Sequence, residues 1–220
     1  MPSLIEQITA AGLTDHIFSE RQLARLLGGS DARRYGVVNR ALKDGSLLRL
    51  KRGTYLLGQR YRSETVHPFA IAQNLVPGSY ISFESALAWH GWIPEAVFVT
   101  ASASPGRKTL HYETNDFGAF SFHPLAIADY QFLVSVDRVQ MGKLTALVAQ
   151  PLRALMDLVT LRKQPWSGME WLVQGMRIDE EKLASLDRKD FDKLKHVYKH
   201  KAVNTFLTSL ESVVITAGKT

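Results

Sequence analysis

The sequence contains no cysteine in its 220 residues. Disulfides and thiolate metal sites are therefore excluded, and the absence fits a reducing compartment. No stretch approaches the roughly 18 consecutive apolar residues that predict a membrane-spanning helix. Residues 1–13 lack the basic start and sustained apolar run of a secretory signal peptide. We therefore expect a cytoplasmic protein that has no membrane partner.

The common sequence motifs of enzymes are also missing. There is no phosphate-binding loop and no G-x-S-x-G nucleophile elbow. The triplet at 180–182 has the E-x-K form used by metal-dependent nucleases, but Leu183 and Leu186 predict a helix there instead of a strand. His196 and His200 lie four residues apart in a predicted helix, yet lysines surround them and no glutamate follows the first. We expect no catalytic residue, metal or cofactor, and hence no enzyme.

Positive charge is concentrated at the two ends of the chain. The net charge of +6 divides into +5 over residues 1–66, −2 over 67–160 and +3 over 161–220. A basic N-terminal segment favours an anionic partner such as nucleic acid. A basic surface that only improves solubility is the alternative at this point.

The N-terminal segment has the element order of a winged helix-turn-helix. Helices are predicted at 3–11, after the S-x-x-Q capping box of Ser19 and Gln22, and from Ser30 to Asp44. The glycine pair at 28–29 separates the second helix from the third. Two strands, at 47–50 and 54–57, form a hairpin that would be the wing.

The third helix and the hairpin carry the residues expected at DNA. Arginine can bind guanine through two hydrogen bonds, and lysine and arginine neutralise phosphates. Tyr35, Val38, Ala41 and Leu42 are predicted to form the buried stripe of the helix. The predicted DNA-binding residues are Arg33, Arg34, Val37, Asn39, Arg40 and Lys43 on the helix and Arg49, Lys51 and Arg52 on the hairpin. A winged helix that contacts only proteins is the alternative.

The pattern of residues 63–220 predicts an α+β domain. Strands are expected at 79–82, 96–101, 109–114, 118–122 and 143–149, forming a mainly antiparallel sheet, with helices at 67–75, 83–90 and 151–162. A helical C-terminal tail follows, at 167–176, 179–186, 188–200 and 202–215. We therefore predict an α+β protein with a winged helix-turn-helix domain over 1–62 and an α+β domain over 63–220.

Three stretches resemble the AbiEi family of antitoxins from bacterial abortive-infection systems (type IV toxin–antitoxin pairs). They are the hairpin GSLLRLKRGTYLL, the stretch VPGSYISFESALAWHGWIP and the helix VAQPLRALMDLV. Their order and spacing match the family over roughly residues 15–162. The family often has an acidic–basic pair where this chain has Leu152 and Arg153, so the resemblance gives no role to Arg153.

The resemblance implies a transcriptional autorepressor that binds operator DNA in its own promoter. The C-terminal domain would counteract a cognate nucleotidyltransferase-like toxin through basic residues. Candidates for that surface are Lys189, Lys193, Lys195, Lys199 and Lys201. Two alternatives stay open: a one-component regulator that senses a ligand near Trp89–Trp92, and a nucleic-acid-processing enzyme to which the winged helix delivers its substrate.

Overall fold

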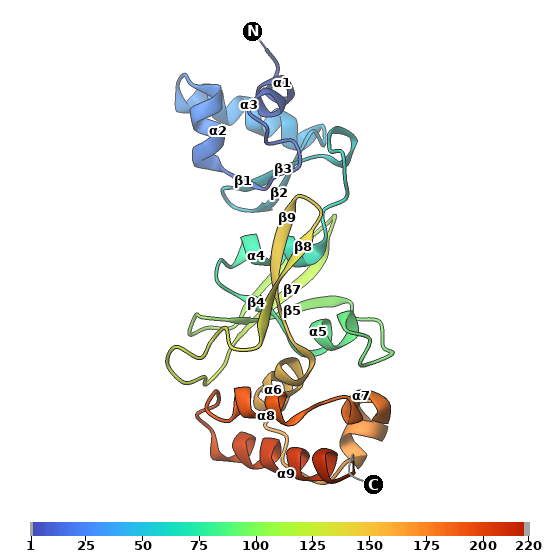
Figure 1. Cartoon of the computed structure of the whole chain (residues 1–220). Coiled ribbons are helices and arrows are strands. Elements are labelled where there is room, and N and C mark those ends of the chain that lie inside the picture. The colour runs from blue at the N-terminus through green and yellow to red at the C-terminus, as the bar shows by residue number, and fades with distance from the viewer. Residues whose placement is uncertain (1, 218–220) are drawn as a thin grey trace. The chain divides into compact units, whose positions relative to one another are not determined.

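The computed structural model describes residues 2–217. Contacts within the chain divide it into two compact units, whose elements are labelled in Figure 1. The N-terminal unit comprises the chain up to Pro77 and the segment Gln140–Ala146, and the C-terminal unit comprises Gly78–Val139 and the chain from Leu147 onward. The contacts therefore group residues 63–77 with the N-terminal unit, whereas the sequence predicted a boundary after residue 62.

Helices surround a small antiparallel sheet in the N-terminal unit (Figure 1). Its elements are α1 (Leu4–Ala10), β1 (Phe18–Ser19), α2 (Glu20–Leu27), α3 (Asp31–Lys43), β2 (Leu47–Lys51), β3 (Thr54–Leu57), the 3-10 turn η1 (Gln59–Tyr61) and α4 (Pro68–Leu75). Strand β3 lies between β1 and β2 and pairs antiparallel with both. The predicted helices and the predicted hairpin are confirmed here.

Local sequence signals define the start and end of α2 and the start of α3. The Ser19 hydroxyl accepts a hydrogen bond from the backbone N–H of Gln22 at 3.3 Å, and the Gln22 side chain accepts one from the Ser19 N–H at 2.8 Å. Ser30 caps α3 with its side chain. Between the helices, Gly28 and Gly29 have φ angles of 57° and 72°, which glycine adopts without strain. The turn between the two helices is thus specified by its own sequence.

Apolar side chains from the helices and the sheet meet in one core in this unit. Its buried members are Leu4, Ile8, Phe18, Leu23, Ala41, Leu47, Tyr55 and Leu57. Val38 and Leu42 of α3 pack against this core as predicted, but Tyr35 is 73% exposed. The prediction for Tyr35 is wrong because position 35 lies about 120° around the helix from the buried Ala41. The aromatic ring therefore faces away from the core.

The C-terminal unit contains most of a larger sheet and the helices that follow it. Its elements are β4 (Tyr80–Ile81), α5 (Phe83–Trp89), β5 (Val99–Ser104), β6 (Leu110–Thr114), β7 (Gly118–Pro124), β8 (Val136–Met141), β9 (Leu144–Ala149), α6 (Pro151–Arg162), the π-helical turn η2 (Trp171–Gly175), α7 (Glu180–Ala184), α8 (Arg188–Leu194) and α9 (Lys201–Ala217). The turn of the β8–β9 hairpin is the segment grouped with the N-terminal unit. The chain is therefore α+β, as predicted.

The larger sheet is mixed, with both antiparallel and parallel neighbours. Its strand order among the described residues is β6-β7-β5-β4-β9-β8. The pairs β4–β5 and β6–β7 are antiparallel, while β4–β9 and β5–β7 are parallel. The predicted β6–β7 hairpin is present, but its second strand returns to lie beside β5. The sequence pattern predicted that β6 and β7 pair with each other, but it did not predict that β7 also pairs with β5.

Four elements of this unit differ from the prediction, the first being the helix predicted over 167–176, of which only the π-helical turn Trp171–Gly175 forms. Strand β5 begins at Val99 instead of residue 96, and β8 was not predicted because its exposed charged residues hide the strand pattern. The helix predicted over 188–200 ends at Leu194. Tyr198 leaves the helical path because its backbone forms a bridge with Ile127 and its side chain is buried. Tertiary contacts thus override the helical pattern of residues 195–200.

Candidate nucleic-acid interface

Small and polar residues share the face of α3 that points away from the core. Ala32, Gly36, Asn39 and Lys43 are spaced i, i+4, i+7 and i+11, so they line one face of the helix. Asn39 is partly exposed and Lys43 is exposed. This face carries hydrogen-bonding groups at one end and little side-chain bulk at the other.

Two arginines flank this outer face along one side. Arg33 and Arg40 are seven residues apart, so they lie two turns apart on the same side of α3. Both side chains are exposed, and the Arg40 Nε donates to the carbonyl of Gly36 at 3.3 Å. Arg40 therefore lies beside Asn39 and Lys43, whereas the Arg33 guanidinium lies near Gly29, where an added Cβ would meet its Nη1 at 3.1 Å.

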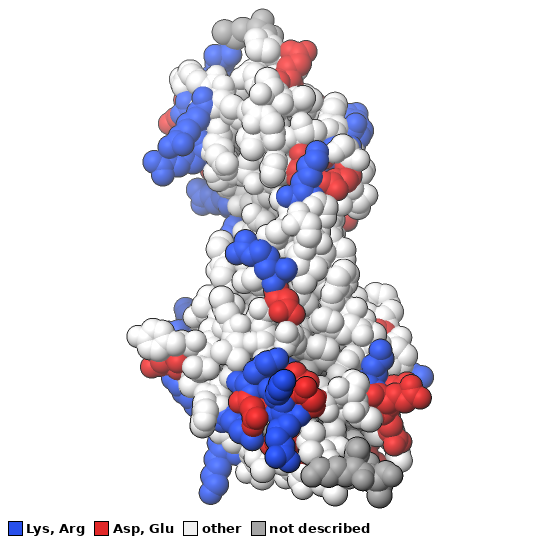
Figure 2. Space-filling view, in the orientation of Figure 1, with Lys and Arg blue, Asp and Glu red and all other residues white. Residues whose placement is uncertain are grey.

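A basic groove lies on the other side of the outer face, between α2, α3 and the β2–β3 hairpin. Its volume is about 820 Å³. Lining side chains that carry charge are Arg21, Arg34, Arg49, Arg52, Glu20 and Asp31, and Tyr35 and Asn39 line it from α3. Arginines thus outnumber acidic residues in the lining. Figure 2 shows Lys and Arg side chains on the surface of this unit.

Two of the α3 residues predicted to contact DNA make contacts within the N-terminal unit. Val37 packs against the hydrophobic core because it lies four residues before the buried Ala41. Arg34 is ion-paired with Asp31 and donates to the carbonyl of Gly29, which places it at the turn before α3. Val37 therefore packs within the unit and Arg34 ties the α2–α3 turn to the helix, while a DNA contact by either residue stays a prediction.

Lys51, another predicted DNA contact, is also engaged within the unit. Its ammonium Nζ donates to the carbonyl of Leu75, at the end of α4, at 2.6 Å. Partial burial lowers the pKa of Lys51 below its ordinary value. The hairpin arginines differ, because Arg49 and Arg52 are exposed and line the groove. The charge that the hairpin presents to a partner is therefore that of Arg49 and Arg52.

Tyr35 and Gly36 lie on the candidate interface but were not among the predicted DNA-binding residues. A Cβ atom placed on Gly36 would meet no atom within 4 Å, so packing does not require glycine at this position. Glycine costs a helix interior about 1 kcal/mol relative to alanine. The signal available in the sequence was a glycine in mid-helix, at a spacing that places it among the exposed residues. Without a side chain here, the helix backbone is open to close approach.

The five lysines of the predicted toxin-neutralising surface do not share one helix face. Lys189 and Lys193 lie on α8, Lys195 and Lys199 lie in the segment after it, and Lys201 begins α9. All five are exposed. Figure 2 shows basic side chains of the C-terminal unit flanked by acidic ones.

Carboxylates neutralise three of these lysines. Lys193 pairs with Asp190 at 3.5 Å, Lys195 pairs with Asp192 and, at 3.4 Å, with Glu211, and Lys199 pairs with Asp129 at 3.2 Å. Within residues 2–217, Lys189 and Lys201 have no ion pair. The positive surface available to a partner is therefore smaller than the sequence suggested.

The residues considered for metal chemistry are not arranged as the sequence suggested. His196 and His200 lie between α8 and α9, so they do not face one another across a helical turn. Glu180 and Lys182 lie on α7, a helix, as predicted. Among residues 2–217, no group of three or more His, Asp or Glu side chains could hold a metal ion.

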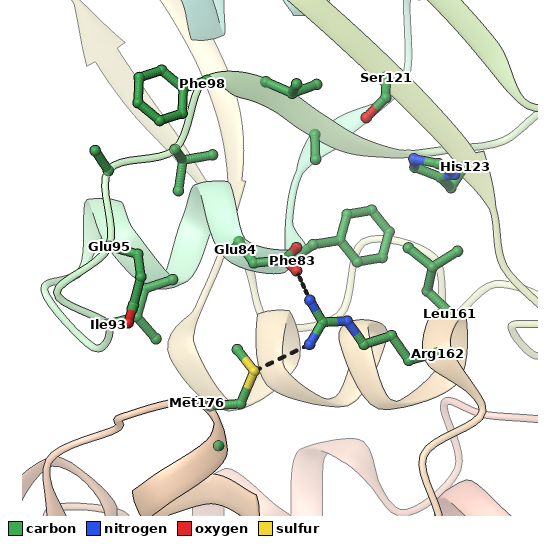
Figure 3. A pocket seen from close by; sticks show the side chains of 15 residues that line it. Phe83, Glu84, Ile93, Glu95, Phe98, Ser121, His123, Leu161, Arg162 and Met176 are labelled. Carbon is green, nitrogen blue, oxygen red and sulfur yellow. Dashed lines mark hydrogen bonds and ion pairs between the residues drawn. The ribbon is translucent and has the colours of Figure 1, made fainter.

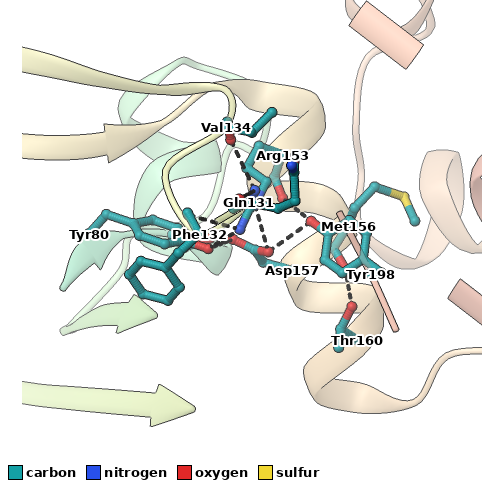
Figure 4. Close-up of polar contacts among 10 residues, drawn as sticks. Tyr80, Gln131, Phe132, Val134, Arg153, Met156, Asp157, Thr160 and Tyr198 are labelled. Atoms are coloured by element: carbon teal, nitrogen blue, oxygen red, sulfur yellow. Dashed lines mark hydrogen bonds and ion pairs between the residues drawn. The ribbon is translucent and has the colours of Figure 1, made fainter. Parts of the chain in front are cut away.

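The two C-terminal stretches that resemble AbiEi antitoxins meet in a buried polar network (Figure 4). Arg153 and Asp157 are fully buried and pair at 3.0 Å, Nε to Oδ1. Asp157 also accepts hydrogen bonds from the hydroxyls of Tyr80 and Tyr198, both at 2.8 Å, and of Ser82, at 2.7 Å. A buried ion pair is tolerated when its remaining hydrogen-bonding groups are satisfied in this way.

The rest of the Arg153 guanidinium is also satisfied. It donates to the Tyr80 hydroxyl at 2.6 Å and to the carbonyls of Val134 and Phe132 at 2.9 and 3.2 Å. The network therefore joins α6 to β4 and to the loop before β8. Because the hydrogen bonds of Arg153 are all made to residues of the same unit, we assign Arg153 to the architecture of this unit and not to ligand binding.

Comparison with known proteins leaves the family open. No protein-family model matches the chain, and no curated protein matches it. The AbiEi resemblance therefore rests on the three quoted stretches alone. Within residues 2–217, no helix has both the length and the apolar character needed to cross a bilayer.

Proposed function

We propose that the N-terminal unit is a winged helix-turn-helix module that binds double-stranded DNA. The observation that carries this proposal is the convergence of α3 and the β2–β3 hairpin on one basic groove. Asn39 lines this groove from α3 and Arg49 and Arg52 line it from the hairpin, while Arg33 and Arg40 lie on the other side of the outer face of α3. The major groove of DNA admits an α-helix, and an adjacent hairpin arm can then reach the flanking phosphates.

The outer face of α3 would read the bases. Asn39 can form two hydrogen bonds with adenine, and Arg40 can form two with guanine. The small residues Ala32 and Gly36 leave the helix backbone open to close approach. Arg33, Lys43, Arg49 and Arg52 would neutralise phosphates, which positions the helix without specifying sequence.

The experiment is binding of the full chain to its own promoter DNA, followed by fluorescence anisotropy. An Arg33→Ala/Arg40→Ala/Arg52→Ala variant should bind at least about a hundredfold more weakly, since one arginine at a base is worth about 1–3 kcal/mol. The matched control is Arg107→Ala/Lys108→Ala/Arg138→Ala, which removes three exposed positive charges from the C-terminal unit. Equal affinity of the two triple variants would refute the assignment of this surface.

We further propose that the chain is an autorepressor and antitoxin of the AbiEi type, which opposes a nucleotidyltransferase-like toxin. The support is the resemblance of the three stretches and the exposed lysines of the C-terminal unit. Lys189 and Lys201 are the best candidates for toxin neutralisation, because the other three lysines are paired with carboxylates.

Co-expression with the product of the adjacent gene tests this second proposal by growth rescue. The intact chain should restore growth, and Lys189→Glu/Lys201→Glu should restore it less well than the control Arg107→Glu/Lys108→Glu. A neighbouring gene that encodes no nucleotidyltransferase-like protein would contradict the antitoxin role. It would leave the DNA-binding proposal to be judged by its own experiment.

A further inference from the structure

A cavity of about 560 Å³ lies within the C-terminal unit (Figure 3). Its walls come from the start of α5, the loop before β5, strands β5 and β7, the end of α6 and the end of η2. Most of the lining is apolar, with the largest side chains supplied by Phe83, Ile93, Phe98, Leu161 and Met176. The volume and the apolar walls are those of a typical small-molecule site.

Two polar side chains of β7 face this cavity. Ser121 and His123 are two residues apart on the strand, so they point to the same side of the sheet, as Figure 3 shows. Ser121 is only 6% exposed. Among the described residues, no hydrogen-bond partner is found for its hydroxyl or for the His123 ring. His123 is partly exposed and the Ser121 Oγ is not among the fully buried unpaired atoms of the described residues, so both groups can be reached from the cavity and are available to a ligand.

His123 supplies a neutral group to the cavity. Partial burial lowers its pKa, and the neighbouring His111 lowers it further, although Glu84 acts in the opposite direction. The ring is therefore uncharged at neutral pH, with one nitrogen that donates and one that accepts. The charged groups nearby neutralise one another, because Arg162 pairs with Glu84 and Arg177 with Glu95. The walls thus favour an uncharged ligand.

The backbone beneath the cavity is strained. Phe83 is fully buried and has a φ of 54°, a conformation that is unfavourable for a bulky residue. Its ring packs edge-on against His123, with centroids 5.6 Å apart. Strained residues of this kind are frequent at ligand sites, because the surrounding structure must hold them in place.

From this geometry we infer that the cavity binds a neutral, mainly apolar small molecule that carries one hydroxyl or carbonyl group. The apolar body of the ligand would lie against Ile93, Leu161 and Met176. Its polar group would pair with the Ser121 hydroxyl and the His123 imidazole. The inference does not depend on the proposed DNA-binding or antitoxin functions, since none of these residues belongs to those surfaces.

The test uses the full chain with 2-naphthol as the probe and naphthalene as the matched compound without a hydroxyl, each titrated by ligand-observed NMR. Saturable binding of 2-naphthol is expected. Ser121→Ala should weaken it about three- to tenfold, the effect of one neutral hydrogen bond, and should leave naphthalene binding unchanged.

Filling the cavity should abolish binding of both compounds. Leu161→Trp and Ala96→Trp are two such variants, and either suffices because both positions are partly or fully exposed and tolerate a larger side chain. The control is Leu110→Trp, since Leu110 and Leu161 are both 37% exposed and Leu110 lies outside the cavity lining. No saturable binding of 2-naphthol up to millimolar concentration, or binding that survives both filling variants, would overturn the inference.

Discussion

Gly36 of the candidate interface and Arg153 of the buried network contribute to this molecule in opposite ways. Gly36 contributes by having no side chain, on a helix face with nothing packed against it. Arg153 contributes through a guanidinium that is fully buried and fully paired. The first residue weakens its helix and leaves room for a partner, whereas the second connects several elements and leaves no room for one. Their substitutions therefore have contrasting expected outcomes.

Gly36→Ala should separate stability from DNA binding. Alanine stabilises a helix interior by about 0.5–1 kcal/mol relative to glycine, so the free energy of unfolding should rise. The added methyl group should hinder approach to the outer face of α3 and weaken promoter binding about tenfold. Denaturant unfolding and anisotropy titration measure the two quantities. A variant that is more stable and binds DNA as tightly as the parent would show that Gly36 is not at the interface.

Arg153→Met should destabilise the C-terminal unit strongly. It leaves the Asp157 carboxylate buried without its cation, a change that costs about 3–5 kcal/mol. Arg153→Met/Asp157→Asn should recover part of that loss, because asparagine still accepts hydrogen bonds and carries no charge. Chemical denaturation followed by tryptophan fluorescence provides the comparison. A double variant less stable than Arg153→Met would contradict the view that the unpaired charge is the source of the loss.

The tyrosines of the same network should make the fold sensitive to alkaline pH. Burial, and then the negative charge of Asp157, raises the pKa of Tyr80 and of Tyr198 well above the ordinary value of about 10. Their stabilising contribution is thus complete below pH 10 and decreases as the pH rises above it, because only the unfolded chain releases these protons there. Unfolding measured from pH 8 to 11 should show this decline. Tyr198→Phe should make it smaller, and an unchanged slope would count against the assignment.

At the scale of the element, signals within a few residues predicted the fold best. The Ser19–Gln22 capping box defines the start of α2, and proline at the first position of α6 accompanies a helix whose observed bounds, Pro151–Arg162, are those predicted. Features of the fold that depend on contacts between residues far apart in the sequence could not be predicted. The position of β7 beside β5 and the departure of Tyr198 from its helix both depend on tertiary contacts.

The same distinction applies to the candidate interface. The sequence identified α3 and the hairpin as the elements that carry the charge, but it did not predict which basic residues would be engaged within the unit. Arg34 and Lys51 donate to backbone carbonyls of other segments, and this could not be predicted from helical or strand periodicity. Tyr35 was assigned to the buried stripe with Val38, Ala41 and Leu42, although its side chain is exposed in the structure.

The hairpin element should contribute phosphate contacts and little sequence preference. Arg49→Ala/Arg52→Ala should weaken binding to promoter and unrelated DNA by similar factors. It should also make the slope of the logarithm of the association constant against the logarithm of salt concentration less negative by about two. One unit of slope is lost for each phosphate that is no longer neutralised. Lys51→Ala is the matched control on the same hairpin, since its Nζ is bound to the Leu75 carbonyl, and it should leave the salt dependence nearly unchanged. If Lys51→Ala changed this slope more than Arg49→Ala/Arg52→Ala, then Lys51 and not the two arginines would be the phosphate contact of the hairpin.

At the scale of the whole molecule, the charge distribution separates the two proposed roles. Residues 1–66 carry a net charge of +5. Three of the five lysines considered in the C-terminal unit are paired with carboxylates. DNA affinity should therefore come from the N-terminal unit, and it should arise from a limited number of phosphate contacts.

Binding of the full chain to its own promoter DNA, measured over a series of salt concentrations, tests the central claim most directly. With about four to six phosphates neutralised, the logarithm of the association constant should fall against the logarithm of salt concentration with a slope of roughly −4 to −5. At physiological salt, promoter DNA should bind about a thousandfold more tightly than unrelated DNA of equal length. Equal affinity for the two DNAs, or affinity that does not change with salt, would contradict a sequence-specific DNA-binding role.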